Sequence, residues 1–78
     1  MPQHDDKVKI IEGYVAEAKL HVDQQARIVE QLRRDGNPTS DAEELLAEYE
    51  GSLAAHQAHL DIAREEARLR TKLNPPLT

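Results

Sequence analysis

The chain has 78 residues, of which 38% are hydrophobic and 32% are charged, and its 15 acidic and 10 basic residues give a formal net charge of -5. It contains no cysteine, which excludes a disulfide framework, a thiolate zinc site and a cysteine nucleophile. The length allows one small domain, and the negative charge argues against nucleic acid or an anionic membrane as the partner.

The first predicted element is a helix over residues 5–34. Its apolar residues recur at alternating spacings of three and four, the a/d pattern of a heptad repeat, which places them on one side of a helix. Gln25 is the one polar member of this stripe. We call the stripe, together with its counterpart in the second helix, the seam. In the first helix the seam consists of Val8, Ile11, Val15, Ala18, Val22, Gln25, Val29 and Leu32.

A turn is predicted over residues 35–40, where the chain reads Asp-Gly-Asn-Pro-Thr-Ser. Gly36 suits the left-handed position just after a helix, and Pro38 prevents the first helix from continuing. Ser40 is the expected N-cap of the next helix, with Glu43 three residues later completing a capping box. Thr39 is the alternative cap.

A second helix is predicted over residues 41–73, and a short tail at 74–78 follows it, beginning with the helix stop Asn-Pro-Pro. Two helices of about 30 residues joined by a short connection pack antiparallel. The sequence therefore predicts a single domain over residues 1–78, an all-α antiparallel two-helix hairpin that resembles a coiled coil. The seam of the second helix consists of Ala42, Leu46, Tyr49, Leu53, His56, Leu60, Ala63 and Ala67.

Apolar residues outside the seam indicate a second contact. Two helices share only one seam, and a domain of this size without disulfides usually needs another source of stability. Two hairpins paired about a two-fold axis into a four-helix bundle would bury a further stripe on each helix. We therefore predict a homodimer, the alternative being scattered surface aliphatics on a monomer. The expected interface residues are Tyr14, Ile28, Ala55, Ala58, Ile62 and Leu69.

Polar residues interrupt the seam at Gln25 and His56. In a hairpin that turns near residue 38, facing residues have numbers that add up to about 76. This register places Gln25 beside Tyr49, a hydrogen-bond partner of the kind that a buried polar group needs. We expect such residues to fix the register of the two helices rather than to take part in chemistry.

The histidines carry an alternative interpretation. The same register brings Glu17 opposite His59 and His21 opposite His56, and three imidazoles and a carboxylate at one level can hold zinc or another divalent ion. The Glu-x-x-His spacing of di-iron bundles is absent, however. Histidines at helical spacing are more often half-exposed polar neighbours, so we expect no metal.

Catalytic patterns do not accompany these residues. The sequence contains no glycine-rich phosphate loop, no nucleophile elbow and no Ser/His/Asp arrangement that indicates a triad. Its many carboxylates fall on the solvated faces of the two predicted helices. We therefore expect neither an enzyme nor a bound cofactor.

The turn and the segments beside it carry a longer motif. The chain reads RRDGNPTSDAEELL over residues 33–46 and EGSLAAH over residues 50–56. It thereby resembles a family of short bacterial hypothetical proteins with an RDG-x-x-T-x-x-AE-x-LL turn and a following ESL-x-x-H stretch, although Gly51 here separates Glu from Ser. The resemblance spans roughly residues 27–60. It implies a helical hairpin without an assigned function and brings no catalytic residues.

These observations favour a small, non-enzymatic interaction, regulatory or structural module that acts through a self-associating helical hairpin. Two alternatives stay open: a metal-binding bundle that uses His21, His56 and His59, and an adaptor that offers a helical stripe to a different protein. No apolar run approaches the roughly 18 residues of a membrane span. We therefore expect a soluble, cytoplasmic protein whose partner is a second copy and not a membrane or a nucleic acid.

Overall fold

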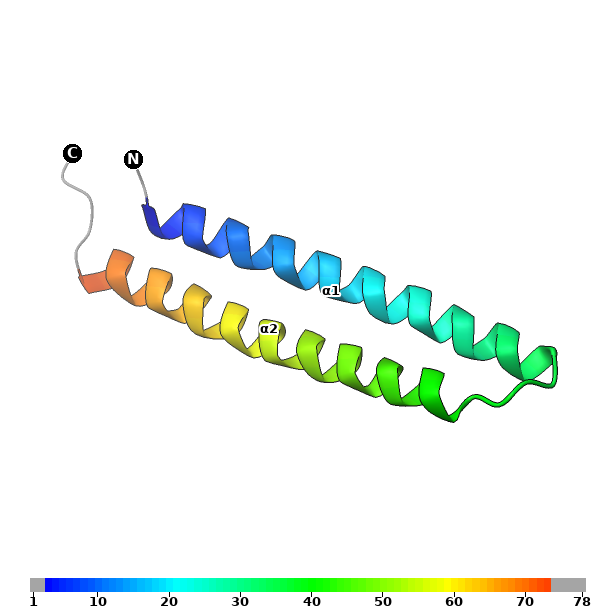
Figure 1. Cartoon of the computed structure of the whole chain (residues 1–78). Coiled ribbons are helices and arrows are strands. Elements are labelled where there is room, and N and C mark those ends of the chain that lie inside the picture. The colour runs from blue at the N-terminus through cyan, green and yellow to red at the C-terminus, as the bar shows by residue number, and fades with distance from the viewer. Residues whose placement is uncertain (1–2, 74–78) are drawn as a thin grey trace.

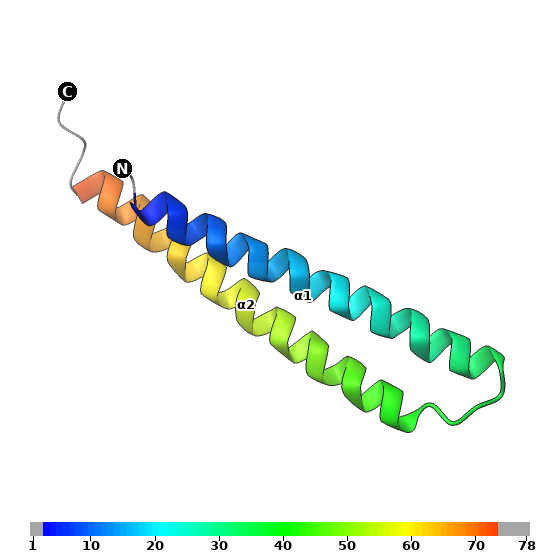
Figure 2. The same ribbon diagram turned by 45° about the horizontal axis from the view of Figure 1, so that its top comes forward.

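The computed structural model describes residues 3–73, with side chains over residues 6–73, so the predicted tail lies outside the described residues. Helix α1 spans Gln3–Arg34 and helix α2 spans Ser40–Leu73, and the two lie side by side and antiparallel (Figure 1). Figure 2 shows the same pairing from a second direction. The predicted all-helical hairpin of two packed helices is confirmed. We call the end with Gln3 and Leu73 the open end, and the opposite end the turn end.

The seam is where the two helices meet. All sixteen of its residues are buried or half-buried. Every other side chain that the structure describes is exposed, with the exception of Thr39, which is half-buried. The heptad spacing therefore identified the inward side of both helices, because residues three and four apart lie on the same side of a helix.

The core is small and lies toward the open end. Ile11 and Val15 of α1 pack there with Leu60 and Ala63 of α2. None of the described side chains is completely buried, because a helix with one neighbour can shield only one side of each residue. Over residues 3–73, neither helix has a segment long and apolar enough to cross a membrane.

The first helix ends in a Schellman motif, with Gly36 in the left-handed position that the sequence predicted for it. Gly36 has a φ of 74°, the left-handed conformation that glycine adopts without a steric penalty. The Asn37 N–H donates to the Leu32 carbonyl oxygen at 2.9 Å, and the Gly36 N–H donates to the Arg33 carbonyl oxygen at 3.1 Å. These two bonds satisfy carbonyl groups that a helix end would otherwise leave unpaired.

The second helix is capped by Thr39 and not by Ser40, so the preferred cap prediction is wrong. α2 begins at Ser40, and the Glu43 N–H donates to the Thr39 carbonyl oxygen at 2.8 Å, which makes Thr39 the residue before the first helical position. The Thr39 hydroxyl donates to the Glu43 carboxylate. The carbonyl oxygen of Thr39 accepts the first bond of the helix, which is the position of an N-cap.

The two helices are offset along the hairpin relative to the expected register. Tyr14 faces His56, and His21 faces Tyr49, so the numbers of the facing rings add up to 70, whereas the ion pairs Glu12–Arg64 and Arg33–Glu43 add up to the expected 76. The prediction that His21 faces His56 is therefore wrong. The reason lies in the connection between the helices, which runs back along the hairpin before α2 begins (Figure 1). The prediction places the turn at residue 38 and does not include the distance that the connection runs back.

Gln25 is the buried polar residue of the seam, with 6% of its surface exposed. Its side-chain Nε2 donates a hydrogen bond to the Ala42 carbonyl oxygen at 3.0 Å. The predicted bond to Tyr49 is wrong, because the offset places Tyr49 beside His21 instead. Gln25 thereby ties α1 to the first turn of α2, and among the described residues no buried side-chain nitrogen or oxygen lacks a partner.

Two glycines lie within the helices, Gly13 in α1 and Gly51 in α2. Both are exposed, and both fall on the sides that point away from the seam. A Cβ atom added at either position would meet no other atom within 4 Å. Neither glycine is therefore required by close packing.

Candidate functional site

The hairpin has two broad faces, one on either side of the seam. In a heptad repeat the e and g positions flank the apolar stripe on opposite sides. Here the e positions of the two helices pair with each other, and so do the g positions. We call the e side, with its neighbouring b positions, the charged face, and the g side, with its neighbouring c positions, the apolar face. The pairs across the seam are Glu12–Arg64 and Arg33–Glu43 on the charged face and Lys7–Glu66 on the apolar face.

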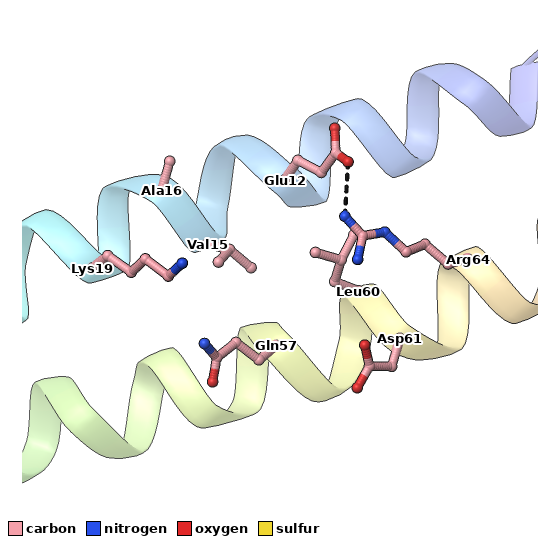
Figure 3. Close-up of a pocket in the computed structure, with 8 residues that line it drawn as sticks. All are labelled: Glu12, Val15, Ala16, Lys19, Gln57, Leu60, Asp61 and Arg64. Carbon is pink, nitrogen blue, oxygen red and sulfur yellow. Dashed lines mark hydrogen bonds and ion pairs between the residues drawn. The ribbon is translucent and has the colours of Figure 1, made fainter.

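The charged face carries ionic and small side chains, with no exposed apolar residue larger than alanine among the residues described. An open groove of about 550 Å³ runs along it, with Val15 and Leu60 of the seam facing each other between the helices (Figure 3). Glu12 and Arg64 form an ion pair at 3.0 Å across this groove. Both partners are about half-exposed, so the pair contributes little to stability.

The apolar face carries the large apolar side chains that the seam does not bury. Eight large apolar side chains are exposed among the described residues, and seven of them lie on this face. The eighth is Leu20, on the outer side of α1. The seven lie on one face because all of them occupy g or c positions of the heptad repeat. They are Ile10, Tyr14, Ile28, Leu45, Ile62, Leu69 and Leu73.

A hollow of about 190 Å³ interrupts the middle of the apolar face. Two tilted ring pairs form it: the centroids of Tyr14 and His56 lie 5.7 Å apart, and those of His21 and Tyr49 lie 5.4 Å apart. In each helix the tyrosine precedes the histidine by one heptad, so antiparallel packing matches each tyrosine with the histidine of the other helix. The remaining lining comes from Glu17, Ala18 and Ser52.

The candidate metal ligands are brought together only in part. Glu17, His21 and His56 line the hollow, whereas His59 is exposed farther toward the open end. His59 does not line the hollow together with Glu17. Within residues 6–73 no group of three histidine or acidic side chains has the geometry to hold a metal ion.

The closest ion pair lies outside both the seam and the hollow. Arg68 and Glu65, one turn apart on α2, approach to 2.6 Å. The hydrogen bond from the Arg68 guanidinium lowers the pKa of the Glu65 carboxyl below its ordinary value, and the same bond raises the pKa of Arg68. Perturbed pKa values mark functional groups when the groups are buried in a cleft. This pair lies on the exposed surface of a helix, where such pairs are common.

The apolar face contains most of the residues that the sequence suggested for an interface. Tyr14, Ile28, Ala55, Ile62 and Leu69 occupy its g and c columns, while Ala58 is exposed on the outer side of α2. That these residues form an interface stays a prediction. The sequence reasoning missed Ile10 and Leu45, although both follow the same heptad columns as the residues it selected.

No known protein family, curated protein or solved structure matches the chain. The resemblance of residues 33–46 and 50–56 to a family of bacterial hairpin proteins therefore stays a prediction. The feature of the molecule that bears on function is the contrast between the apolar face and the charged face.

Proposed function

We propose that the chain is a small non-enzymatic interaction module that works by self-association. The apolar face of one hairpin covers the same face of a second copy, and the two hairpins form a four-helix bundle. The observation that carries this proposal is the one-sided distribution of the exposed apolar residues. Single surface aliphatics need no partner, whereas a contiguous apolar patch bordered by polar residues is typical of an interaction site.

The small core gives a second reason for the proposal. Leu46, Tyr49, Leu53 and His56 belong to the seam but are only half-buried by α1. A domain of this size rarely gains enough stability from one core of this kind, and the chain has no cysteine with which to form a disulfide. A second pair of helices would cover the side of these residues that α1 leaves open.

The dimensions of the apolar face suit such a dimer. The Cα extents of the hairpin are 64 by 16 by 12 Å, so a broad face measures on the order of 1,000 Å². Standard-size interfaces bury about 800 Å² on each partner. A face that runs the length of both helices therefore offers enough area for a stable pair.

The mass in solution tests the proposal. We expect twice the chain mass of 8.8 kDa by sedimentation equilibrium. Ile62→Glu places a charge on the apolar face and should convert the dimer to a monomer at the same concentration. Leu20→Glu is the matched control, because Leu20 is 53% exposed and Ile62 57%, but Leu20 lies on the outer side of α1.

Three outcomes would contradict self-association through the apolar face. One is a monomeric wild-type chain, and another is an equal effect of the two substitutions on the dimer. The third is a chain that becomes stably helical only when a different protein is added, which would indicate an adaptor that uses the apolar face for another partner.

A further inference from the structure

We propose that the two hairpins of the dimer point in the same direction, with both turns at one end, so that α1 of each copy packs on α2 of the other. The inference rests on the proposed function, because it assigns the geometry of that same apolar face. A two-fold axis then runs along the bundle. Each residue of α1 meets the residue of the partner's α2 that lies at the same distance from the turn. Two-fold symmetry requires the same contact between α2 of the first copy and α1 of the partner.

The two ring pairs of the hollow define which residues lie at the same level of the hairpin. Together with the ion pairs and the hydrogen bond that cross the seam, they give sums of residue numbers between 67 and 76, so the numbers of level residues add up to about 72 in this molecule. One residue corresponds to about 1.5 Å along a helix. Differences of two or three from this sum are therefore within the reach of a side chain.

Four of the seven large apolar residues of the face match each other on this scale. Toward the open end, Ile10 is level with Ile62, and toward the turn end, Ile28 is level with Leu45. When α1 packs on the partner's α2, each of these side chains meets an apolar side chain of the other copy. Four pairs of large aliphatic residues would be buried in this way, two where α1 packs on the partner's α2 and two where α2 packs on the partner's α1.

The polar residues of the face match in the same manner. Glu17 is level with Ser52, and a serine hydroxyl donates readily to a carboxylate. His21 is level with Glu48, which can accept a hydrogen bond from its imidazole N–H. These two polar side chains of α1 thus have a polar counterpart at the same level, which avoids the cost of burying them unpaired.

The opposite orientation, with the turn of one copy on the open end of the other, brings Ile10 level with the partner's Ile28 but matches poorly on α2. In that orientation α2 packs on the partner's α2. The apolar face of α2 carries one large apolar residue, Leu45, on the turn side of the hollow, but Ile62, Leu69 and Leu73 on the open side. One leucine can cover only part of that set, and the rest would be left facing polar side chains or solvent.

Disulfide cross-linking distinguishes the two orientations cleanly, because the chain has no cysteine of its own. Chains with Ile10→Cys are mixed with chains with Ile62→Cys, refolded together and oxidised. We expect a covalent dimer in clear excess over either variant oxidised alone. A mixture of Ile28→Cys and Leu45→Cys chains repeats the test at the other end of the face, with circular dichroism confirming that every variant is helical.

The control mixture pairs Ile10→Cys chains with Ile28→Cys chains, which should give only background cross-linking. If this mixture cross-links as well as or better than the first while the protein remains dimeric by mass, the proposed orientation is wrong and self-association still holds. If the protein is monomeric and no mixture cross-links, the proposed function is wrong together with the inference.

Discussion

The two ends of the seam are held together by different interactions. Toward the open end, Ile11 and Val15 pack against Leu60 and Ala63 in a continuous apolar core. Toward the turn end, no residue of α2 is buried as deeply, and the buried amide of Gln25 donates a hydrogen bond to the backbone of α2. Both helices therefore bury apolar residues deeply at one end, whereas at the other end only α1 does so, with Val29, and a hydrogen bond and helix caps are added.

Chain connectivity explains this difference. Near the turn, the short connection keeps the two helices close, so little entropy is lost when they pack there. The core lies about twenty residues from the turn along each helix, where side-chain burial opposes separation. The deepest apolar burial thus lies well away from the covalent link.

The largest effect that tests this comparison is expected for Leu60→Ala. Leu60 is 7% exposed, and truncating a buried leucine costs about 2–5 kcal/mol of unfolding free energy. Leu46 occupies the same heptad position two repeats closer to the turn, where it is half-buried, and Leu46→Ala should cost about half as much. Urea unfolding followed by circular dichroism measures both, and equal losses would show that the two ends are equally packed.

A smaller effect is expected for Gln25, at the turn end. Gln25→Ala removes the hydrogen bond to Ala42 and should lower the free energy of unfolding by about 1–2 kcal/mol. Gln25→Leu keeps the volume and should be close to neutral, because an apolar residue of similar shape needs no partner. Urea titration of both variants provides the measurement. A loss as large as that of Leu60→Ala would mean that this hydrogen bond contributes as much to stability as the apolar core does.

The cap of α2 should contribute less again. Thr39→Ala removes the hydroxyl that bonds to Glu43 and should cost about 1 kcal/mol, as other cap deletions do. Ser40→Ala is the control, because Ser40 is exposed inside the first turn and its loss should stay within about 0.5 kcal/mol. Thermal unfolding of the two variants side by side decides between the caps. The reverse order would restore Ser40 as the capping residue.

The smallest effect is expected for Glu65→Gln, which removes the ion pair with Arg68. The lowered pKa of Glu65 means that the pair stabilises the helix at neutral pH and that this stabilisation disappears as the pH falls through the lowered pKa. Both groups are exposed, so salt screens their attraction. The melting temperature near neutral pH should fall less than for Thr39→Ala, and the difference should vanish in acid; a difference that persists in acid would contradict this account.

The sequence was sufficient for the seam and the end of α1 because both depend on local signals. The spacing of three and four selects one side of a helix without knowledge of the partner. Gly36 followed by Pro38 stops the first helix and leaves the left-handed position to the residue that adopts it most easily. The choice between Thr39 and Ser40 was harder, since either side chain can accept the first free N–H groups of a helix.

The offset of the helices and the content of the hollow could not be predicted in the same way. The offset depends on how far the connection runs along the hairpin, and heptad spacing carries no information about that path. In the hollow, the numbers of the facing rings add up to six less than expected, more than one and a half helical turns, and two tyrosine–histidine pairs replace the expected histidine pair. It also moved the partner of Gln25 to the first turn of α2.

The glycines on the outer sides of the helices lower the stability of a single hairpin. Alanine at Gly13 or at Gly51 would gain roughly 0.5–1 kcal/mol at each position, because glycine loses more backbone freedom than alanine on entering a helix. An added methyl group meets nothing at either place, so the gain would come without any rearrangement. With glycine at these two positions, both helices are less stable than they would be with alanine. An isolated copy should therefore open and close readily, and fast amide hydrogen exchange near Gly13 and Gly51 would show it.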